Sequence, residues 1–443
     1  MRSTVLTLSI LSFASAAATV AALEGAPAGS WPHWRGPRAT GEAPTGTPPL
    51  EWAEGKNVRW RVEIPGKGLS TPVVWGDKIF LTTAVPVGPA APEPAAAADA
   101  GGRMPKVAAD RPQRFVVLAL DRKTGKILWE RTAREGVPHE GTHGDASWAS
   151  ASPATDGERL FASFGSNGLY AYDFAGQLLW STDLGDMKTR NGFGEGSSPV
   201  VVGDLVVVNW DAENGSFIVA LDKKTGAERW RQPREEVTSW STPLAVEVGG
   251  KTQVVVSATG RTRGYDAATG AVVWQAPGMT TNTIPSPVEA EGVVYVTSGF
   301  QGNALQAIRL ADAQGEVTGP PALLWSHGQD TPYVPSPVLH DGTLYFLKRN
   351  NGLLSALDAK TGAVKYGPVR LDALDGIYAS PVAAAGRIYI AGRNGKTMVI
   401  KAGGEFQVLA TNTLDDRFDA SPAVLGDDLL LRGHRYLYLL GGP

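Results

Sequence analysis

The chain has 443 residues, enough for a large buried core, and its formal net charge of −3 is close to neutral for that length. A charge this small argues against a nucleic-acid partner and against binding to an anionic membrane surface. The chain has no cysteine, which excludes disulfide bonds and a lipidated cysteine, and its 53 glycines and 31 prolines are typical of an all-β fold with many turns.

The N-terminus predicts a signal peptide over residues 1–22. Arg2 supplies a positive start, residues 5–20 are apolar and rich in small side chains, and Ala16 or Ala22 offers a cleavage position. A short N-terminal anchor or a buried segment is the alternative interpretation. No later run approaches about 18 apolar residues, so we expect no transmembrane span. The sequence predicts an exported protein, periplasmic or extracellular, and soluble after signal cleavage.

Residues 23–56 form an N-terminal extension that precedes the repeats. It contains the run Trp31-Pro32-His33-Trp34-Arg35-Gly36-Pro37. Residues 57–443 are predicted to form the folded domain.

A repeated small residue, then proline, then an apolar run marks eight units. The prolines are Pro72, Pro153, Pro199, Pro243, Pro287, Pro337, Pro381 and Pro422. After a first gap of 81 residues the spacing stays between 41 and 50. A period in the forties is the size of one four-stranded propeller blade, so the spacing predicts an eight-bladed β-propeller of four-stranded antiparallel blades.

A second marker, the turn Asp-x-x-Thr-Gly, begins at Asp121, Asp222, Asp266 and Asp358. A tryptophan stands four residues after the turn glycine at Trp129, Trp180, Trp230 and Trp274, while Tyr366 holds that place in unit six and Trp325 marks unit five. Asp121, Thr124, Gly125 and Trp129 show both features in the first unit. We expect the aspartate to accept hydrogen bonds from turn amides and the glycine to adopt a positive φ. The tryptophan is predicted to pack one blade on the next.

The first and last units depart from the pattern. Residues 85–112 interrupt unit one between its second and third strands with an Ala/Pro-rich insertion, for which a lid and an inert flexible segment are both open interpretations. Unit eight lacks its fourth strand. Residues 57–62 read as an orphan fourth strand with Trp60, so we expect the N-terminal strand to complete the last blade and close the ring.

The repeat order places two classes of loop on one face, where a binding site is expected. One class precedes the proline-marked strand and the other joins the second and third strands. The candidate ligand-face residues in these loops are His143, Asp145, Trp148, Glu195, Asp211, Trp240, Arg349, Asn350, Tyr378, Arg393 and Asp419. For each of them, an ion pair between blades or an aromatic channel plug is the alternative to a binding role.

Motifs for catalysis or metal binding are missing from the sequence. His139 and His143 are four residues apart but lie in loop sequence without an identifiable third ligand, so we expect no metal site. No Gly-x-Ser-x-Gly elbow and no phosphate-binding loop occurs. Catalytic and cofactor-binding residues are therefore left unassigned.

The unit that runs from Ala119 to Trp129, repeated from Ala220 to Trp230, resembles the repeat of the pyrroloquinoline-quinone (PQQ)-like propeller superfamily. The resemblance covers residues 57–440 and includes two branches. Quinoprotein dehydrogenases oxidise alcohols or sugars with PQQ and calcium, and many carry a cysteine pair that this chain lacks. Propellers like BamB are interaction scaffolds without a cofactor. The chain is most similar to secreted PQQ-like repeat proteins of unassigned activity.

This resemblance implies a non-catalytic scaffold that binds another protein or an envelope component, with no cofactor and as a monomer. The alternative is a PQQ-dependent oxidoreductase acting on alcohols or sugars with calcium. The repeat motif itself packs blades together, so it does not decide between the two.

Overall fold

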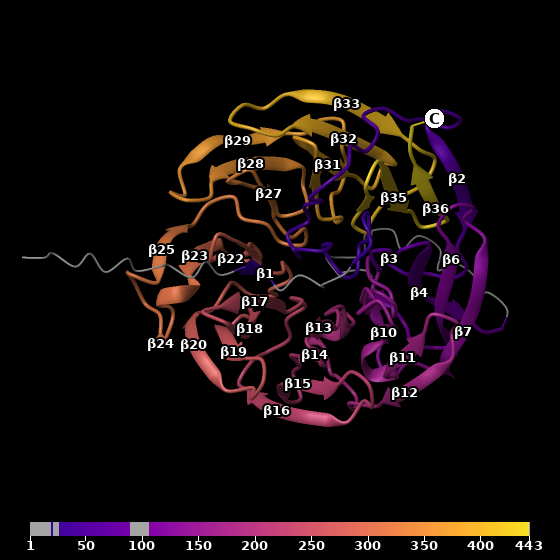
Figure 1. The fold of residues 1–443 in the computed structure, drawn as a ribbon, viewed down its shortest axis with the longest axis horizontal. Helices are drawn as coiled ribbons and strands as arrows, with labels where there is room; N and C mark the ends of the chain where they lie inside the picture. The colour runs from indigo at the N-terminus through magenta and orange to yellow at the C-terminus, as the bar shows by residue number, and fades with distance from the viewer. Residues whose placement is uncertain (1–18, 21–25, 89–105, 443) are drawn as a thin grey trace, which may run out of the picture.

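The computed structural model of the protein describes residues 19–20, 26–88 and 106–442. Eight sheets stand around a central axis as the blades of a propeller (Figure 1). In each blade four antiparallel strands run from the centre of the ring to its rim. The predicted all-β, eight-bladed architecture is confirmed.

The first four blades follow one another along the chain. Blade one has β3 (Val73–Trp75), β4 (Lys78–Pro86), β6 (Gln113–Asp121) and β7 (Ile127–Gly136). Blade two has β9 (Ala154–Thr155), β10 (Arg159–Ser163), β11 (Leu169–Asp173) and β12 (Leu178–Thr182). Blade three has β13 (Val200–Val202), β14 (Leu205–Trp210), β15 (Ser216–Asp222) and β16 (Glu228–Arg234). Blade four has β17 (Leu244–Val248), β18 (Lys251–Val256), β19 (Arg261–Asp266) and β20 (Val272–Pro277).

The remaining blades continue the order. Blade five has β21 (Val288–Ala290), β22 (Val293–Ser298), β23 (Ala304–Arg309) and β25 (Leu323–His327). Blade six has β26 (Val338–His340), β27 (Thr343–Lys348), β28 (Leu353–Asp358) and β29 (Val364–Arg370). Blade seven has β30 (Val382–Ala384), β31 (Arg387–Ala391), β32 (Lys396–Lys401) and β33 (Val408–Thr413). Blade eight has β34 (Ala423–Leu425), β35 (Asp428–Arg432), β36 (Tyr436–Leu440) and β2 (Val58–Glu63).

Short elements decorate the ring. The sheet of blade four gains β1 (Thr19–Val20) on its inner strand and β24 (Gly315–Glu316) on its outer strand. β5 (Lys106–Val107) pairs with β8 (Thr142–His143). The 3₁₀ turns are Gly165–Asn167, Arg190–Gly192 and Leu310–Asp312. Within the described part of the chain, no helix has the length and apolar character needed to cross a membrane.

Blade eight contains strands from both ends of the chain. β2 pairs antiparallel with β36, with Trp60 opposite Leu439 and Val62 opposite Leu437. Figure 1 shows the indigo β2 beside the yellow β36. This pairing is consistent with the split blade expected from the sequence, and it leaves the last blade no open edge at β36.

The Asp-x-x-Thr-Gly turns have the expected geometry. Asp121 accepts hydrogen bonds from the Thr124 amide at 2.8 Å and from the Thr124 hydroxyl at 2.6 Å. Gly125 has a φ of 72°, and a Cβ there would lie 2.7 Å from the indole of Trp60 in the previous blade. The glycine is therefore needed twice, for its backbone conformation and for the ring that packs on it.

Most of the blade tryptophans dock on the turn of the following blade. Trp129, Trp180, Trp230 and Trp325 each donate their indole N–H to a carbonyl of that turn. Trp274 differs, because it donates to Gln253 Oε1 of its own blade. β24 pairs with the outer strand there, Trp274 opposite Gly315, and Trp274 is fully buried. Trp274 still packs on blade five, in one core cluster with Val294 and Ile308, so only its hydrogen bond differs from the other junctions.

Two sequence predictions fall largely beyond the described residues. Of the predicted signal peptide, only Thr19–Val20 is described. Of the insertion 85–112, residues 89–105 lie outside the described part, while β4 ends at Pro86 and β6 begins at Gln113. The insertion therefore does join the second and third strands of blade one, as expected.

Candidate functional site

A belt of hydroxyl groups lines the central channel, at the residue before the marker proline of each unit. Its members are Thr71, Ser152, Ser198, Thr242, Ser286, Ser336, Ser380 and Ser421. At seven junctions the backbone N–H of one member donates to the hydroxyl oxygen of the member in the next blade, at 2.9 to 3.1 Å. A residue before proline is held extended, which fixes the direction of this N–H.

The belt is interrupted where the two ends of the chain meet. Among the described residues no such bond joins Ser421 to Thr71, and the Thr71 hydroxyl is buried without a partner. Arg432 of blade eight spans this junction instead, donating to Ser70 O at 3.1 Å and Thr82 O at 2.9 Å. Burial lowers the pKa of Arg432 to about 9, so it remains charged at neutral pH.

One end of the channel is closed by residues 26–52, here called the strap. Trp31 exchanges two backbone hydrogen bonds with Val74 of blade one, both 2.8 Å, and the Ala43 amide donates to Ala383 of blade seven at 2.9 Å. The strap therefore crosses the ring on the side of the turns between first and second strands. In Figure 1 the indigo chain passes over the yellow blades to the middle of the ring.

Two side chains of the strap enter the channel. The Trp34 indole donates to the belt hydroxyl of Ser286 at 3.1 Å. The guanidinium of Arg35 is fully buried and donates to the carbonyls of Pro381 and Pro337, both at 2.7 Å. The strap thus binds to the ring by hydrogen bonds to backbone and hydroxyl oxygens, and it closes the channel below the belt.

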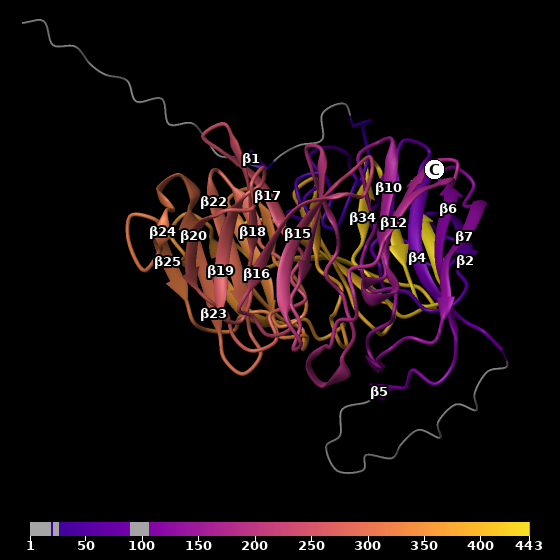
Figure 2. The ribbon, with the colours of Figure 1, turned by 90° about the horizontal axis from the view of Figure 1, so that it is seen from below.

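Above the belt the channel widens into a pocket of about 400 Å³, here called the cup. Seven belt residues, from Ser152 to Ser421, line it together with Trp34. The cup opens on the loop face, the side that carries β5 in Figure 2, opposite to β1. Its aromatic lining consists of Trp34, Phe193, Trp240, Phe300, Tyr333 and Tyr378. Four of the sequence-predicted candidates with ionisable side chains line it as well, namely His143, Asp145, Glu195 and Asp419.

Asp145 and Asp419 belong to one ion network on the loop face. Arg393 lies 2.9 Å from Asp145 and 2.5 Å from Asp419, and Arg417 contacts the same two carboxylates at 3.1 and 3.3 Å. The second oxygen of Asp419 also lies 2.9 Å from His434 Nε2. Asp145 comes from the loop before blade two, Arg393 from blade seven and Asp419 from the loop before blade eight, so the network joins loops from opposite ends of the chain.

Electrostatics follow from this arrangement. Burial on its own would raise the pKa of Asp419, but hydrogen bonds from His434 and Arg393 outweigh burial and lower the pKa below its ordinary value. Tyr378 donates its hydroxyl to Asp145 at 3.1 Å, and the Arg393 guanidinium stacks on the Tyr378 ring at 3.2 Å. Each of the two carboxylates is therefore already paired with arginine side chains.

Glu195 occupies a different environment on the opposite wall. Its two carboxylate oxygens accept hydrogen bonds from the Ser166 amide at 2.8 Å and the Ser166 hydroxyl at 2.6 Å. Burial raises the pKa of Glu195 to about 7 in spite of these bonds. The raised pKa distinguishes Glu195 from Asp419, whose pKa is lowered by its cationic and hydrogen-bonding partners.

The remaining candidates are placed by packing. Trp240 lines the cup and donates to Gly194 O at 2.7 Å, while Trp148 donates to Glu140 O beside it. Asp211 is fully buried in a two-bond pair with Arg234, at 2.6 and 3.1 Å. Arg349 is exposed, and Asn350 contributes its carbonyl to a backbone bond from Ile377. The structure does not bring Asp211, Arg349 or Asn350 into the cup.

His139 and His143 do not converge on a common ligand position. His139 Nε2 bonds to Met187 O at 2.8 Å, and His143 Nδ1 accepts the amide of Asp145 at 3.1 Å.

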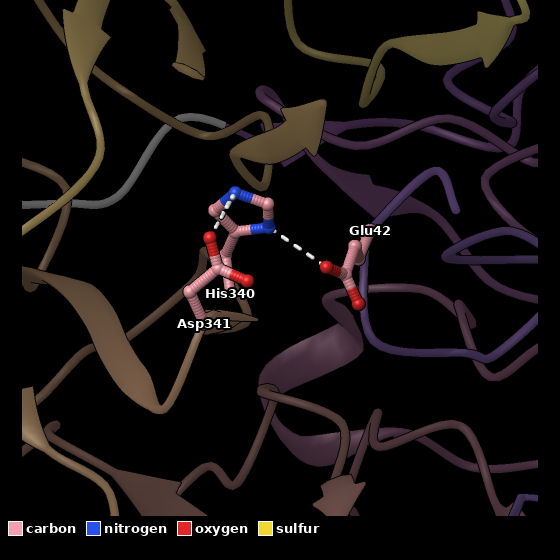
Figure 3. Close-up of side chains that lie close together, drawn as sticks. All are labelled: Glu42, His340 and Asp341. Atoms are coloured by element: carbon pink, nitrogen blue, oxygen red, sulfur yellow. Dashed lines mark hydrogen bonds and ion pairs between the residues drawn. The ribbon is translucent and has the colours of Figure 1, made fainter. Parts of the chain in front are cut away.

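A separate cluster of Glu42, His340 and Asp341 lies at the edge of the strap (Figure 3). His340 Nδ1 is 2.7 Å from Glu42, and its other nitrogen, Nε2, is 3.3 Å from Asp341. Glu42 and Asp341 thus contact opposite nitrogens of the His340 imidazole. A single metal ion bound to one of these nitrogens would not also lie at the other nitrogen, where the second carboxylate is. The hydrogen bond to Glu42 raises the pKa of His340, so we interpret the cluster as an ion pair that fastens the strap to blade six.

Several residues of the cup escaped sequence reasoning. The belt was used only to mark the repeats, although a serine or threonine before every marker proline is itself the signal for a ring of hydroxyls. Trp34 belongs to the N-terminal run Trp31–Pro37, to which sequence reasoning assigned no structural role. Arg417, Phe300 and Tyr333 carry no local signal, because they meet the others only through closure of the ring.

Comparisons with known proteins agree with this architecture. The family described as outer membrane protein assembly factor BamB matches residues 113–367. No curated protein matches the chain. Among solved structures, BamB from Moraxella catarrhalis superposes with a TM-score of 0.55 at 14% identity, covering 86% of this chain and 98% of its own.

Two quinohemoprotein alcohol dehydrogenases are similar in the same way. ADHIIG from Pseudomonas putida HK5 has a TM-score of 0.57 at 12% identity and covers 94% of this chain and 81% of its own. The enzyme from Comamonas testosteroni has a TM-score of 0.52 at 11% identity and covers 96% and 84%. At these identities the likeness concerns the fold alone.

Proposed function

The chain belongs to the family described as outer membrane protein assembly factor BamB, and from this premise we propose that it is a non-catalytic binding propeller whose loop face holds another protein or envelope component. The observation that carries the proposal is the state of the loop-face carboxylates. Asp145 and Asp419 are compensated by Arg393 and Arg417, and Glu195 is held by Ser166. All three carboxylates therefore already have partners within the protein.

The surface around the cup supports the same function. Val107, Val137 and Val237 are 37%, 54% and 36% exposed; Val107 lies in the short strand β5 and the other two lie in loops, all on the loop face. Exposed apolar side chains beside a concave site are typical of a surface that a partner covers. We propose that the protein acts as a monomer outside the cytoplasm, following the signal peptide predicted for residues 1–22.

The alternative is a quinoprotein oxidoreductase, which requires a site for PQQ and calcium. Calcium takes six to eight oxygen ligands, several of them carboxylates. In the cup Asp145 and Asp419 each bind two arginines, and no lysine or arginine among the described residues lines the cup to meet an anionic cofactor. The residues present do not fit PQQ with calcium, and we derive no step through it.

A cofactor-binding experiment separates the two functions. Purified protein is incubated with PQQ and calcium, dialysed and examined for quinone absorbance and for dye-linked oxidation of ethanol and glucose. We expect neither retained absorbance nor oxidation. Retained quinone together with substrate oxidation would overturn the scaffold proposal.

A crosslinking experiment tests the binding face directly. A photoreactive amino acid replaces Val137 or Val237, with Leu178, which is 50% exposed on outer strand β12, as the matched control. Irradiation of the producing cells should give a discrete protein adduct from the two loop-face positions and none from position 178. Equal labelling from all three positions, or none from the loop face, contradicts the proposal.

A further inference from the structure

The cup has the features of a small-molecule site, and its aromatic wall indicates a ligand with a flat ring. The rings of Phe300 and Tyr333 are stacked with centroids 4.7 Å apart, and Trp240 and Phe193 lie in the same lining. Aromatic side chains bind flat rings by stacking or edge contacts. A volume of about 400 Å³ also falls in the usual range for such sites.

The belt hydroxyls at the floor of the cup indicate which hydrogen-bonding groups the ligand carries. Each belt hydroxyl from Ser152 to Ser421 uses its oxygen to accept a backbone N–H of the preceding blade. Among the described residues none accepts the hydroxyl protons in return, and these side chains are at least nine-tenths buried. A hydroxyl has one donor to give. The floor therefore offers donors and calls for a ligand with oxygen acceptors.

The charged side chains around the cup favour an uncharged ligand. No lysine or arginine among the described residues lines it, so an anion finds no cation there. Asp145 and Asp419 are paired with Arg393 and Arg417, and the oxygens of Glu195 accept hydrogen bonds from Ser166, so each carboxylate of the lining already has partners. A charged group that is buried without a partner is strongly unfavourable, so the cup selects against charged ligands.

We propose that the cup binds an uncharged aromatic compound that bears carbonyl or ether oxygens, with its ring on the aromatic wall and its oxygens on the belt. This inference rests on the proposed function, since it names a ligand for the same face. Sugars do not satisfy this chemistry, because their many hydroxyl donors would meet few free acceptors in the lining.

Binding of four small probes tests the ligand class. Tryptophan fluorescence and calorimetry measure acetophenone as the neutral probe, acetylbenzoate as the anion, acetylbenzylammonium as the cation and methyl glucoside as the donor-rich control. We expect saturable binding of acetophenone and affinities at least about tenfold weaker for the other three. Absence of acetophenone binding, or equal affinity for any of the others, overturns the proposal.

Two variants locate the binding in the cup. Phe300→Ala removes part of the wall and should weaken acetophenone binding at least about tenfold. Phe406→Ala, a matched change in blade seven away from the cup, should leave binding unchanged. Ser336→Ala removes one belt hydroxyl and should weaken binding of acetophenone more than that of toluene, which has no acceptor. Equal loss for both probes contradicts the role of the belt.

The result is distinguishable from a failure of the proposed function. If acetophenone does not bind while the Val137 and Val237 adducts persist, the ligand class is wrong and the scaffold function stands. If the adducts are also absent, both the ligand class and the proposed scaffold function are wrong.

Discussion

The indole of Trp60 packs directly on Gly125 of the next blade and donates its N–H to Arg122 O at 3.0 Å. Trp60 lies on β2, the strand that completes blade eight, and Gly125 lies in the third-to-fourth-strand turn of blade one. This contact repeats at the closing junction the docking seen at Trp129, Trp180, Trp230 and Trp325. Trp60 therefore links the N-terminal strand to blade one, while the pairing of β2 with β36 links the same strand to blade eight.

Removing this link should destabilise the entire ring. Trp60→Ala is expected to lower the free energy of unfolding by about 3 kcal/mol, the low end for a large aromatic side chain because Trp60 is partly exposed. Deletion of residues 57–62 should cost more, since it exposes the edge of β36. Thermal unfolding measures both. An unchanged midpoint after the deletion is incompatible with a ring closed by β2.

Gly125→Ala isolates the packing part of the contact. The new Cβ meets the Trp60 ring at 2.7 Å in addition to the strain of a φ of 72°. Gly76→Ala is the matched control in the same blade, since Gly76 has a φ of 59° and open space around its Cβ position. Backbone strain alone costs about 1–2 kcal/mol, so Gly125→Ala should lose clearly more. Equal losses in denaturant unfolding would show that the tryptophan contact is dispensable.

Arg393→Ala should destabilise the loop-face network. Arg393 bonds to Asp419, whose side chain is 2% exposed, and its removal leaves this carboxylate with Arg417 and His434 only. Breaking a buried pair costs about 3–5 kcal/mol, and we expect the lower limit because the Arg417 ion pair and the His434 hydrogen bond remain. Arg349→Ala, exposed on the same face, should change stability by less than about 0.5 kcal/mol. Chemical denaturation of both variants checks this difference.

The pair of Glu42 and His340 predicts a pH dependence. Glu42 raises the pKa of His340 above its ordinary 6.5, so the folded state binds the proton more tightly than the unfolded chain. The stabilisation is complete below pH 6.5 and is lost as the pH rises through the raised value. Glu42→Gln should therefore cost about 1.5 kcal/mol at pH 6 and progressively less toward alkaline pH.

The control for this pH dependence is Glu54→Gln. Glu54 forms an exposed ion pair with Arg61, and this pair contains no histidine. Its effect on stability should stay constant over the same pH range. A Glu42→Gln penalty that also stays constant would contradict the charged state of His340.

The blade pattern was predictable because its signals are local. Asp121, Thr124 and Gly125 make their turn within five residues, and the marker prolines repeat with the period of a blade. At Trp274 the motif predicted the packing on the next blade, but it did not predict β24, a strand outside the repeat that pairs with the outer strand there.

The sequence predicted which face of the propeller carries the candidate site, but it did not predict which side chains of that face line the cup. His143, Asp145, Glu195, Trp240, Tyr378 and Asp419 do line the cup, but Arg349 and Asn350 occupy equivalent loops without entering it. Loop position sets the face, whereas the side-chain direction depends on each loop's own backbone and on its neighbours.

By itself the sequence determined the eight repeats, their turns and the order of the strands, because these depend on hydrogen bonds and φ preferences between residues close in the chain. Only the tertiary structure decided that the strap closes one end of the channel, that eight hydroxyls form a belt and that Arg393 compensates Asp145 and Asp419. These contacts join residues from different blades or from a blade and the strap. Closure of the ring brings them together, and no spacing along the sequence records the distance between them.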